Sequence, residues 1–175
     1  MKRIPSLVRK KAARVRLLLL DVDGVLTDGR IIMDDRGVET KHFDVRDGQG
    51  ISLLLRAGMQ VGFVTGRSSK VVDLRARELG VDLVFQGVAD KLACYRSIKL
   101  QLDITDHEVA FVGDDMADLP VLAQVGLALS VADGWPELVR TVHYITSARG
   151  GRGAVREVAE LLLKCQGKWS KAASG

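Results

Sequence analysis

The sequence contains no apolar run long enough to cross a membrane. Its longest apolar run near the start is the four leucines at 17–20, which Asp21 ends. A spanning helix needs about 20 residues, and the apolar core of a secretory signal needs roughly 7 to 15. The only two cysteines, Cys94 and Cys165, lie in helix-like patterns without the spacing of metal ligands, which is typical of free thiols in a reducing compartment. We therefore expect a cytoplasmic protein with no membrane partner.

Aromatic residues make up only 5% of the chain, and residues 1–16 contain no acidic side chain. That segment holds seven of the 26 basic residues, and the other 19 are balanced by 22 acidic ones. The net charge of +4 therefore belongs to the N-terminal segment and not to a basic stripe of the kind that binds nucleic acid. We expect no nucleic-acid partner and interpret residues 1–14 as a solvated basic extension. A weak electrostatic contact with an anionic surface is the alternative.

Only three prolines interrupt the chain, against 18 glycines, and short apolar runs alternate with helix-like patterns. Nearly continuous apolar strands are typical of a parallel sheet covered on both faces. The alternation predicts an α/β fold, namely a Rossmann-like three-layer sandwich with a mostly parallel sheet. We expect one domain over residues 15–167 and a flexible C-terminal tail at 168–175. The predicted strands are 15–21, 60–65, 82–86, 108–113, 126–130 and 143–146, and the predicted helices are 48–57, 69–79, 91–102, 117–124, 136–140 and 154–166.

One segment departs from this alternation. Residues 29–43 place apolar residues on both sides of a turn-like stretch, 34–37, with the sequence DDRG. This pattern predicts a small β-hairpin inserted after the first strand. The stretch between Asp21 and Thr65 has room for that hairpin only, so we expect no cap domain.

Polar and charged residues directly follow three of the predicted strands. In open α/β sheets, ligands bind beyond the carboxyl ends of the strands, and two carboxylates two residues apart on an extended chain point to the same side. The candidates are Asp21 and Asp23 after the first strand, Thr65, Gly66 and Arg67 after the second, Asp114, Asp115 and Asp118 after the fourth, and Lys91 at the start of a helix.

Five carboxylates at one edge of a sheet would repel one another unless a cation neutralised them. Mg²⁺ suits such a site, because it takes a few carboxylates, waters and a substrate phosphate. With the metal bound, Asp21 can stay ionised and attack phosphorus as a nucleophile. Lys91 and Thr65 can stabilise the charge on the transferring group.

Each of these motifs is weak by itself. An Asp-x-Asp pair is at least as often a turn or helix cap, Gly-Asp-Asp is more often a surface turn, and a lysine after Asp is usually a solvated helix start. Their joint placement at strand ends and helix starts, in an order that lets them share one rim, favours a single active site.

The four motifs resemble those of the haloacid dehalogenase superfamily. Residues 19–25, with the sequence LLDVDGV, are similar to its first motif, and residues 113–118, GDDMAD, are similar to its fourth. Thr65 corresponds to the second motif and Lys91 to the third. The resemblance implies that residues 15–167 form a phosphatase domain of this superfamily.

The same resemblance implies a mechanism. Asp21 attacks phosphorus, and Asp23 protonates the leaving oxygen and then activates the water that hydrolyses the aspartyl-phosphate. Mg²⁺ is held by the Asp21 carboxylate, the Asp23 main-chain carbonyl and Asp114. Asp115 and Asp118 orient the site.

Three stretches are similar to the 3-deoxy-D-manno-octulosonate 8-phosphate phosphatase family more specifically: 21–29 (DVDGVLTDG), 43–50 (FDVRDGQG) and 150–157 (GGRGAVRE). The resemblance implies hydrolysis of that phosphorylated sugar acid, which supplies the inner core of lipopolysaccharide. It also implies a homotetramer in which the hairpin, residues 31–43, forms the core and a neighbouring subunit covers each active site.

The sugar acid carries a carboxylate as well as a phosphate, and arginine binds carboxylates through paired hydrogen bonds. A solvated helix face is the alternative for Arg75, and a purely structural role is the alternative for Arg152. By resemblance, residues 44–48 form a substrate loop with Ser52 nearby. The complete set of expected substrate contacts is Asp23, Asp44, Val45, Arg46, Asp47, Gly48, Ser52, Gly66, Arg67, Arg75 and Lys91, with Arg152 in support.

Three alternatives remain open at this stage. A phosphatase of a nine-carbon sugar acid 9-phosphate would keep the same motifs, and the lack of a fused synthetase weakly favours the eight-carbon substrate. A phosphomutase would keep Asp21 and Asp23 but return the phosphoryl group to a sugar. A non-catalytic assembly module is disfavoured because the residues of all four motifs are present.

Overall fold

The computed structural model describes residues 4–173 and is built on a six-stranded sheet in the order β5-β4-β1-β6-β7-β8. Every pair of neighbouring strands runs parallel, as the alternation of strands and helices predicts. The first strand is central, with the second and fourth predicted strands as its two neighbours. The strands of this sheet are β1 (Leu17–Leu20), β4 (Gln60–Val64), β5 (Leu83–Phe85), β6 (Val109–Gly113), β7 (Leu127–Ser130) and β8 (Tyr144–Ile145).

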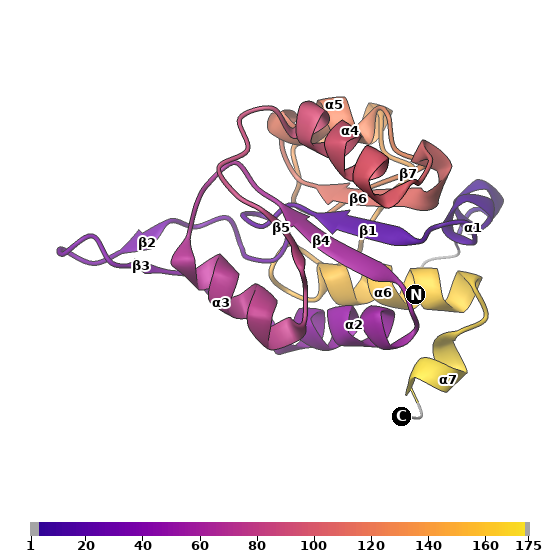
Figure 1. Cartoon of the computed structure of the whole chain (residues 1–175), viewed down its shortest axis with the longest axis horizontal. Helices are drawn as coiled ribbons and strands as arrows, with labels where there is room; N and C mark the ends of the chain where they lie inside the picture. The colour runs from indigo at the N-terminus through magenta and orange to yellow at the C-terminus, as the bar shows by residue number, and fades with distance from the viewer. Residues whose placement is uncertain (1–3, 174–175) are drawn as a thin grey trace.

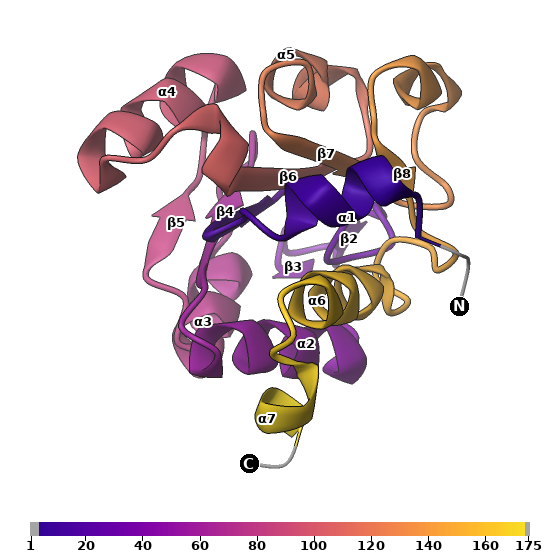
Figure 2. The same ribbon diagram turned by 90° about the vertical axis from the view of Figure 1, so that its right-hand side faces the viewer.

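Helices cover both faces of the sheet, which confirms the predicted three-layer sandwich (Figures 1 and 2). Successive side chains of β1 alternate between the layers: Leu18 and Leu20 belong to one buried cluster, Leu17 and Leu19 to the other. One layer holds α2 (Val45–Arg56), α3 (Lys70–Leu79) and α6 (Ala154–Cys165); the other holds α4 (Lys91–Leu102), α5 (Leu119–Leu122) and the 3₁₀ segment η3 (Pro136–Arg140). Two further 3₁₀ turns are η1 (Asp106–Glu108) and η2 (Met116–Asp118), so the predicted helix 117–124 is split between η2 and α5.

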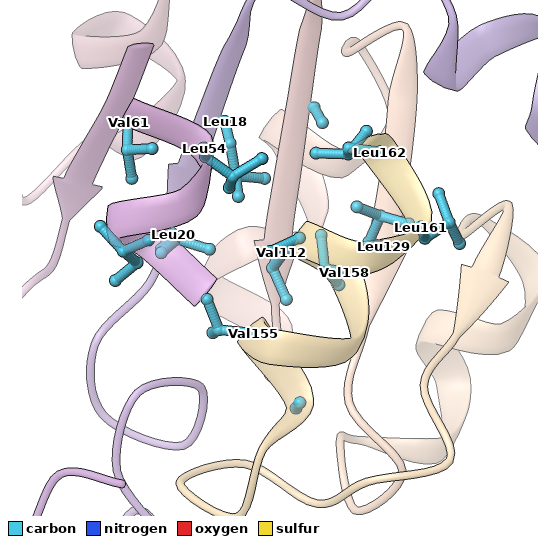
Figure 3. Close-up of a cluster of buried hydrophobic side chains, with 14 of the residues drawn as sticks. Leu18, Leu20, Leu54, Val61, Val112, Leu129, Val155, Val158, Leu161 and Leu162 are labelled. Atoms are coloured by element: carbon cyan, nitrogen blue, oxygen red, sulfur yellow. The ribbon is translucent and has the colours of Figure 1, made fainter. Parts of the chain in front are cut away.

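The larger core lies between the sheet and the pair α2 and α6. The side chains labelled in Figure 3 come from both helices and from β1, β4, β6 and β7, and all of them are apolar. Fully burying one such leucine or valine stabilises the fold by roughly 1.5–3 kcal/mol. The residues labelled in Figure 3 are Leu18, Leu20, Leu54, Val61, Val112, Leu129, Val155, Val158, Leu161 and Leu162.

The N-terminal segment forms a helix, α1 (Ser6–Ala12), that lies against the domain. Val8 and Ala12 are buried in the larger core, whereas Arg9 and Lys10 on its other side are exposed. The helix is therefore solvated on one face only. The domain boundary at residue 15 stays a prediction.

At the other end of the chain, the short helix α7 (Trp169–Ala173) follows α6. The Trp169 ring lies 5.6 Å from the Arg156 guanidinium carbon and 4.8 Å from Lys164 Nζ, which is cation–π distance. Residues 174–175 of the predicted flexible tail lie outside the described residues. Among the described helices, none combines the length and apolar character needed to span a bilayer, and both cysteines are free thiols.

The predicted hairpin is present as β2 (Ile32–Met33) and β3 (Glu39–Thr40), which pair antiparallel and project from the body of the domain (Figure 1). The Asp34 carboxylate closes its turn by accepting hydrogen bonds from the main-chain N–H groups of Arg36 and Val38, at 3.0 and 2.8 Å. Between β1 and β4 the chain builds only this hairpin and α2, so no cap domain is present there.

Helix α6 begins after Gly153, which has no side chain with which to cap it. Asp47 of the neighbouring helix α2 caps it instead: its carboxylate accepts hydrogen bonds from Gly153 N at 3.1 Å and Arg156 N at 2.8 Å. Asp47 is 1% exposed, and burial raises its pKa against the effect of these two hydrogen bonds.

Replacing Asp47 should therefore destabilise the fold. In Asp47→Ala the two helix N–H groups lose their acceptor, which we expect to lower the free energy of unfolding by about 1–3 kcal/mol. Urea denaturation measures the change, and Asp82→Ala, which removes an exposed carboxylate, is the matched control. Equal stability of the two variants would contradict this role.

Candidate active site

The predicted site residues after β1, β4 and β6 meet at the carboxyl edge of the sheet. Asp21 follows β1 directly, and its main-chain N–H donates to Val112 O of β6 at 3.0 Å. This bond extends the ladder by one residue and fixes where the Asp21 side chain starts. The residue is 7% exposed, so its carboxylate is largely withdrawn from solvent.

Lys91 joins two of these carboxylates. It is the first residue of α4, where Asp90 caps the helix, and its Nζ lies 2.9 Å from Asp21 Oδ1 and 2.6 Å from Asp118 Oδ1. Asp118 is fully buried, and its Oδ2 accepts from the main-chain N–H groups of Asp114 at 3.0 Å and Asp115 at 3.3 Å. Asp118 thus holds both the lysine and the turn after β6. Asp115 itself caps η2 through Met116 N.

A cation fits between Asp21 and Asp114. Oxygens of Asp21, Asp114 and Asp118 lie within 4.8 Å of one another, but both Asp118 oxygens are occupied by Lys91 and main-chain N–H groups. Asp114 Oδ1 is buried and has no hydrogen-bond partner. Desolvation and the repulsion between these carboxylates raise the pKa of Asp114 to about 8 and that of Asp21 to about 6. A hard divalent ion such as Mg²⁺ would satisfy the unpaired oxygen and keep both groups ionised. The main-chain carbonyl of Asp23 stays a prediction as a third ligand.

The Asp114 carboxylate lies directly on the backbone of Gly24. A Cβ at position 24 would stand 1.9 Å from Asp114 Oδ2, and the residue has a φ of +94°. Only glycine allows this approach and this conformation. The glycine of the first motif therefore shapes the metal site directly.

The second motif supplies one buried and two exposed residues. Thr65 is 3% exposed, and its main chain is fixed by hydrogen bonds to Phe85 O and from Val88 N at 2.9 and 3.1 Å. Gly66 and Arg67 follow on the surface. Arg67 Nε lies 3.7 Å from Asp23 Oδ2, so this arginine lies at the candidate catalytic edge, where Asp21, Asp23 and Asp114 follow their strands.

The hairpin also reaches Asp23, which the sequence pattern did not predict. Lys41 Nζ contacts Asp23 Oδ1 and lies 3.3 Å from Glu39 Oε1, and Arg67 Nη2 lies 2.8 Å from the same Glu39 oxygen. The only sequence signal was that positions 39 and 41 alternate onto one side of a strand. Nothing in the pattern says that this side faces Asp23.

The expected substrate loop at 44–48 is wrong as a loop, because α2 starts at Val45 and not at Gly48. Asp44 is its N-cap and accepts from Arg46 N at 2.7 Å. This capping by Asp44 extends the helix by three residues. The Asp47 carboxylate points toward α6 and accepts from its first main-chain N–H groups, and a contact with substrate stays a prediction. Val45 is exposed, and Ser52 is half-buried further along the helix.

The four candidate arginines do not all lie together. Arg46 pairs with Asp44 at 2.6 Å and donates to Arg152 O at 3.0 Å, and Arg152 lines a surface pocket of about 230 Å³ with Asp28, His42, Phe43, Asp44 and Gly151. Arg75 lies over the Phe43 ring, 5.7 Å from its centre, and pairs with Glu78 at 2.8 Å. The structure thus brings Arg46 and Arg152 together, places Arg67 at the catalytic edge, and gives Arg75 packing partners.

The fold and the site together define a class of protein. A parallel sheet with two aspartates after its central strand, a threonine after one neighbour, an acidic turn after the other and a lysine opening a helix is the arrangement of the haloacid dehalogenase superfamily.

Comparison with known proteins narrows this class. No family model matches the chain. It is 47% identical over 161 residues to the 3-deoxy-D-manno-octulosonate 8-phosphate phosphatase KdsC of Yersinia pestis, covering 92% of this chain and 86% of that protein. It is 48% identical over 162 residues to KdsC of Escherichia coli K12, covering 93% and 86%. The chain belongs to the 3-deoxy-D-manno-octulosonate 8-phosphate phosphatase family.

The fold of this chain is also similar to that of a solved structure of the same family. The Moraxella catarrhalis 3-deoxy-D-manno-octulosonate 8-phosphate phosphatase, crystallised in complex with a magnesium ion, a phosphate ion and a KDO molecule, has a TM-score of 0.93 and 41% identity. The match covers 95% of this chain and 96% of that one.

The raised pKa values of Asp21 and Asp114 give a testable pH dependence. Without metal, the folded protein holds protons on these groups that the unfolded chain releases near pH 4. Its stability therefore falls as pH rises from about 4, less steeply above about 6, and levels off above about 8. Mg²⁺ binds the ionised carboxylates, so the increase in Tm on adding it should be larger at pH 8 than at pH 5. Thermal unfolding with and without Mg²⁺ measures this.

Asp114→Asn provides the decisive comparison, because it removes one ionisable ligand and leaves a side chain of the same shape. We expect the variant to lose most of the Mg²⁺ effect and to show a weaker pH dependence, while Asp82→Asn behaves as wild type. A wild-type Mg²⁺ response in Asp114→Asn would contradict the assignment.

Proposed function

We propose that this protein hydrolyses 3-deoxy-D-manno-octulosonate 8-phosphate to the free sugar acid and inorganic phosphate, with Mg²⁺ as cofactor. The observation that carries the proposal is the buried Asp21 carboxylate, 2.9 Å from Lys91 Nζ and beside Asp114, at the end of the central strand. The identity of the substrate is inferred from the family to which the chain belongs. The reaction would serve lipopolysaccharide core synthesis in the cytoplasm.

Asp21 is the nucleophile. One of its oxygens attacks phosphorus, the bond between phosphorus and the sugar oxygen breaks, and Asp23 gives its proton to that leaving oxygen. Asp23 then takes a proton from a water molecule, which attacks the phosphoryl group and regenerates the Asp21 carboxylate. When bound by Asp21 and Asp114, Mg²⁺ supplies positive charge that reduces repulsion between the carboxylate and the incoming phosphate.

Lys91 provides fixed positive charge beside the transferring group. Its side chain is 6% exposed, and two carboxylates hold it, so it needs little rearrangement when charge develops on phosphate oxygens. The buried Thr65 offers a hydroxyl donor in the same role. Asp118 acts by holding Lys91 in position.

The carboxylate of the substrate needs binding residues of its own. Arg46 and Arg152 lie together at the edge of the surface pocket, and Arg67 is 42% exposed at the catalytic edge. These three can form paired hydrogen bonds with a carboxylate. Arg75 is the weaker candidate, because its side chain is only 17% exposed, whereas those of the other three are 42–65% exposed.

Phosphate release tests the activity. With Mg²⁺ and the 8-phosphate, Asp21→Asn should lower kcat by at least about 10³-fold, since loss of a nucleophile removes the covalent route. Asp82→Asn is the matched control. The nine-carbon sugar acid 9-phosphate serves as a competing substrate, and a higher kcat/KM for it would reassign the substrate. Undiminished activity in Asp21→Asn would overturn the mechanism, and phosphoryl transfer to a sugar without phosphate release would indicate a mutase.

We propose further that the protein is a homotetramer with its hairpins at the centre and its active sites near subunit interfaces. The hairpin projects from the domain, and Ile31, Met33 and Val38 on it are 62%, 58% and 55% exposed. Exposed apolar side chains gathered on one projection are typical of an interaction surface.

Replacing Ile31, Met33 and Val38 together by serine should give monomers with at least about tenfold lower kcat/KM, because the neighbouring subunit no longer covers the site. Light scattering measures the oligomer, and Leu100→Ser, at an exposed leucine on α4, is the control. A fully active monomer would exclude a catalytic need for assembly.

A further inference from the structure

Two charged residues of the hairpin, Glu39 and Lys41, place their side chains at the candidate active site and not on the outer surface of the hairpin. Lys41 Nζ contacts Asp23 Oδ1, and Glu39 Oε1 lies 3.3 Å from the same nitrogen. The Lys41 side chain is 3% exposed, although it extends from a hairpin whose apolar residues are largely exposed. A lysine so well buried is rare without partners, and here both partners are carboxylates.

Arg67 provides a useful contrast. It also contacts both acids, with Nη2 2.8 Å from Glu39 Oε1 and Nε 3.7 Å from Asp23 Oδ2. Its side chain is 42% exposed and can meet a substrate, whereas that of Lys41 cannot without rearrangement. The two Asp23 oxygens therefore face two different cations, and Glu39 holds both cations in place.

We propose that Lys41 is a positioning residue for Asp23, with Glu39 as its support. This inference rests on the proposed phosphatase function, in which Asp23 protonates the leaving oxygen. An aspartate carboxylate can rotate about its side-chain bonds. It transfers a proton efficiently only when its oxygens are correctly oriented. Asp23 is 22% exposed at its side chain, so core packing alone does not fix it, and the buried ion pair supplies that constraint.

The leaving group distinguishes this role from a structural one. A sugar alcohol leaves phosphorus poorly and needs the Asp23 proton, whereas p-nitrophenolate leaves without it. The ratio kcat/KM reports the steps up to formation of the aspartyl-phosphate and departure of the leaving group. Mispositioning Asp23 therefore lowers kcat/KM for the sugar phosphate much more than for p-nitrophenyl phosphate.

The test compares Lys41→Met with wild type on both substrates in the presence of Mg²⁺. We expect kcat/KM for 3-deoxy-D-manno-octulosonate 8-phosphate to fall about 10–100-fold, which is part of the roughly 10²–10⁴-fold that general acid catalysis contributes. We expect kcat/KM for p-nitrophenyl phosphate to fall less than about threefold. Arg16→Met is the matched control, because Arg16 precedes β1 at the opposite end of the sheet and pairs with Glu108 at 2.9 Å. Lys41→Arg should recover part of the loss.

Equal losses on the two substrates, or no loss on either, would overturn the positioning role. Light scattering and thermal unfolding establish that Lys41→Met keeps the wild-type oligomer and fold. If it does not fold, Glu39→Gln takes its place, with the same selectivity expected at smaller magnitude. Failure of wild type to hydrolyse either phosphate would refute the proposed function instead, so the two failures are distinguishable.

Discussion

The arrangement of the active site depends on one crowded electrostatic contact. Asp21, Asp114 and Asp118 present carboxylate oxygens to one another in a largely buried space, and Lys91 provides one positive charge among them. One buried lysine cannot neutralise three carboxylates, which is why burial and repulsion raise two of their pKa values so far. The fold concentrates negative charge at this point and leaves it incompletely compensated. Three carboxylates and one ammonium group leave about two uncompensated negative charges, which one divalent cation would balance.

The main chain around these carboxylates is also closely packed. Asp114 lies against Gly24, and a Cβ at Gly150 would stand 1.7 Å from Gly24 O. The segments around Gly24 and Gly150, which are far apart in sequence, therefore meet through main-chain atoms, and the Asp114 carboxylate lies against the same Gly24. This explains why glycines recur in two of the stretches that resemble the family. They permit the approach of the loop after β1 to the turn before α6, and that approach places the carboxylates.

The sequence predicted most of the sheet and the catalytic edge, because both depend on local patterns that topology then brings together. Asp21, Thr65 and Asp114 each directly follow an apolar strand, and parallel strands must deliver their carboxyl ends to one edge. Asp47 could not be assigned in this way, since a carboxylate near a helix start is equally consistent with binding a ligand. Its partners, the N–H groups of Gly153 and Arg156, are over a hundred positions away in the chain. The position of Lys41 could not be predicted for a similar reason. The turn sequence predicts the hairpin, but the orientation of the hairpin depends on contacts with Asp23 and Arg67.

The link through Asp47 also has a mechanical consequence. It fastens the first turn of α2 to the first turn of α6, and Arg46 adds a second link through Arg152 O. The two arginines at the pocket edge are therefore carried by one rigid unit and not by two independent loops. Any opening of this edge must therefore move the main-chain segments that carry both arginines together.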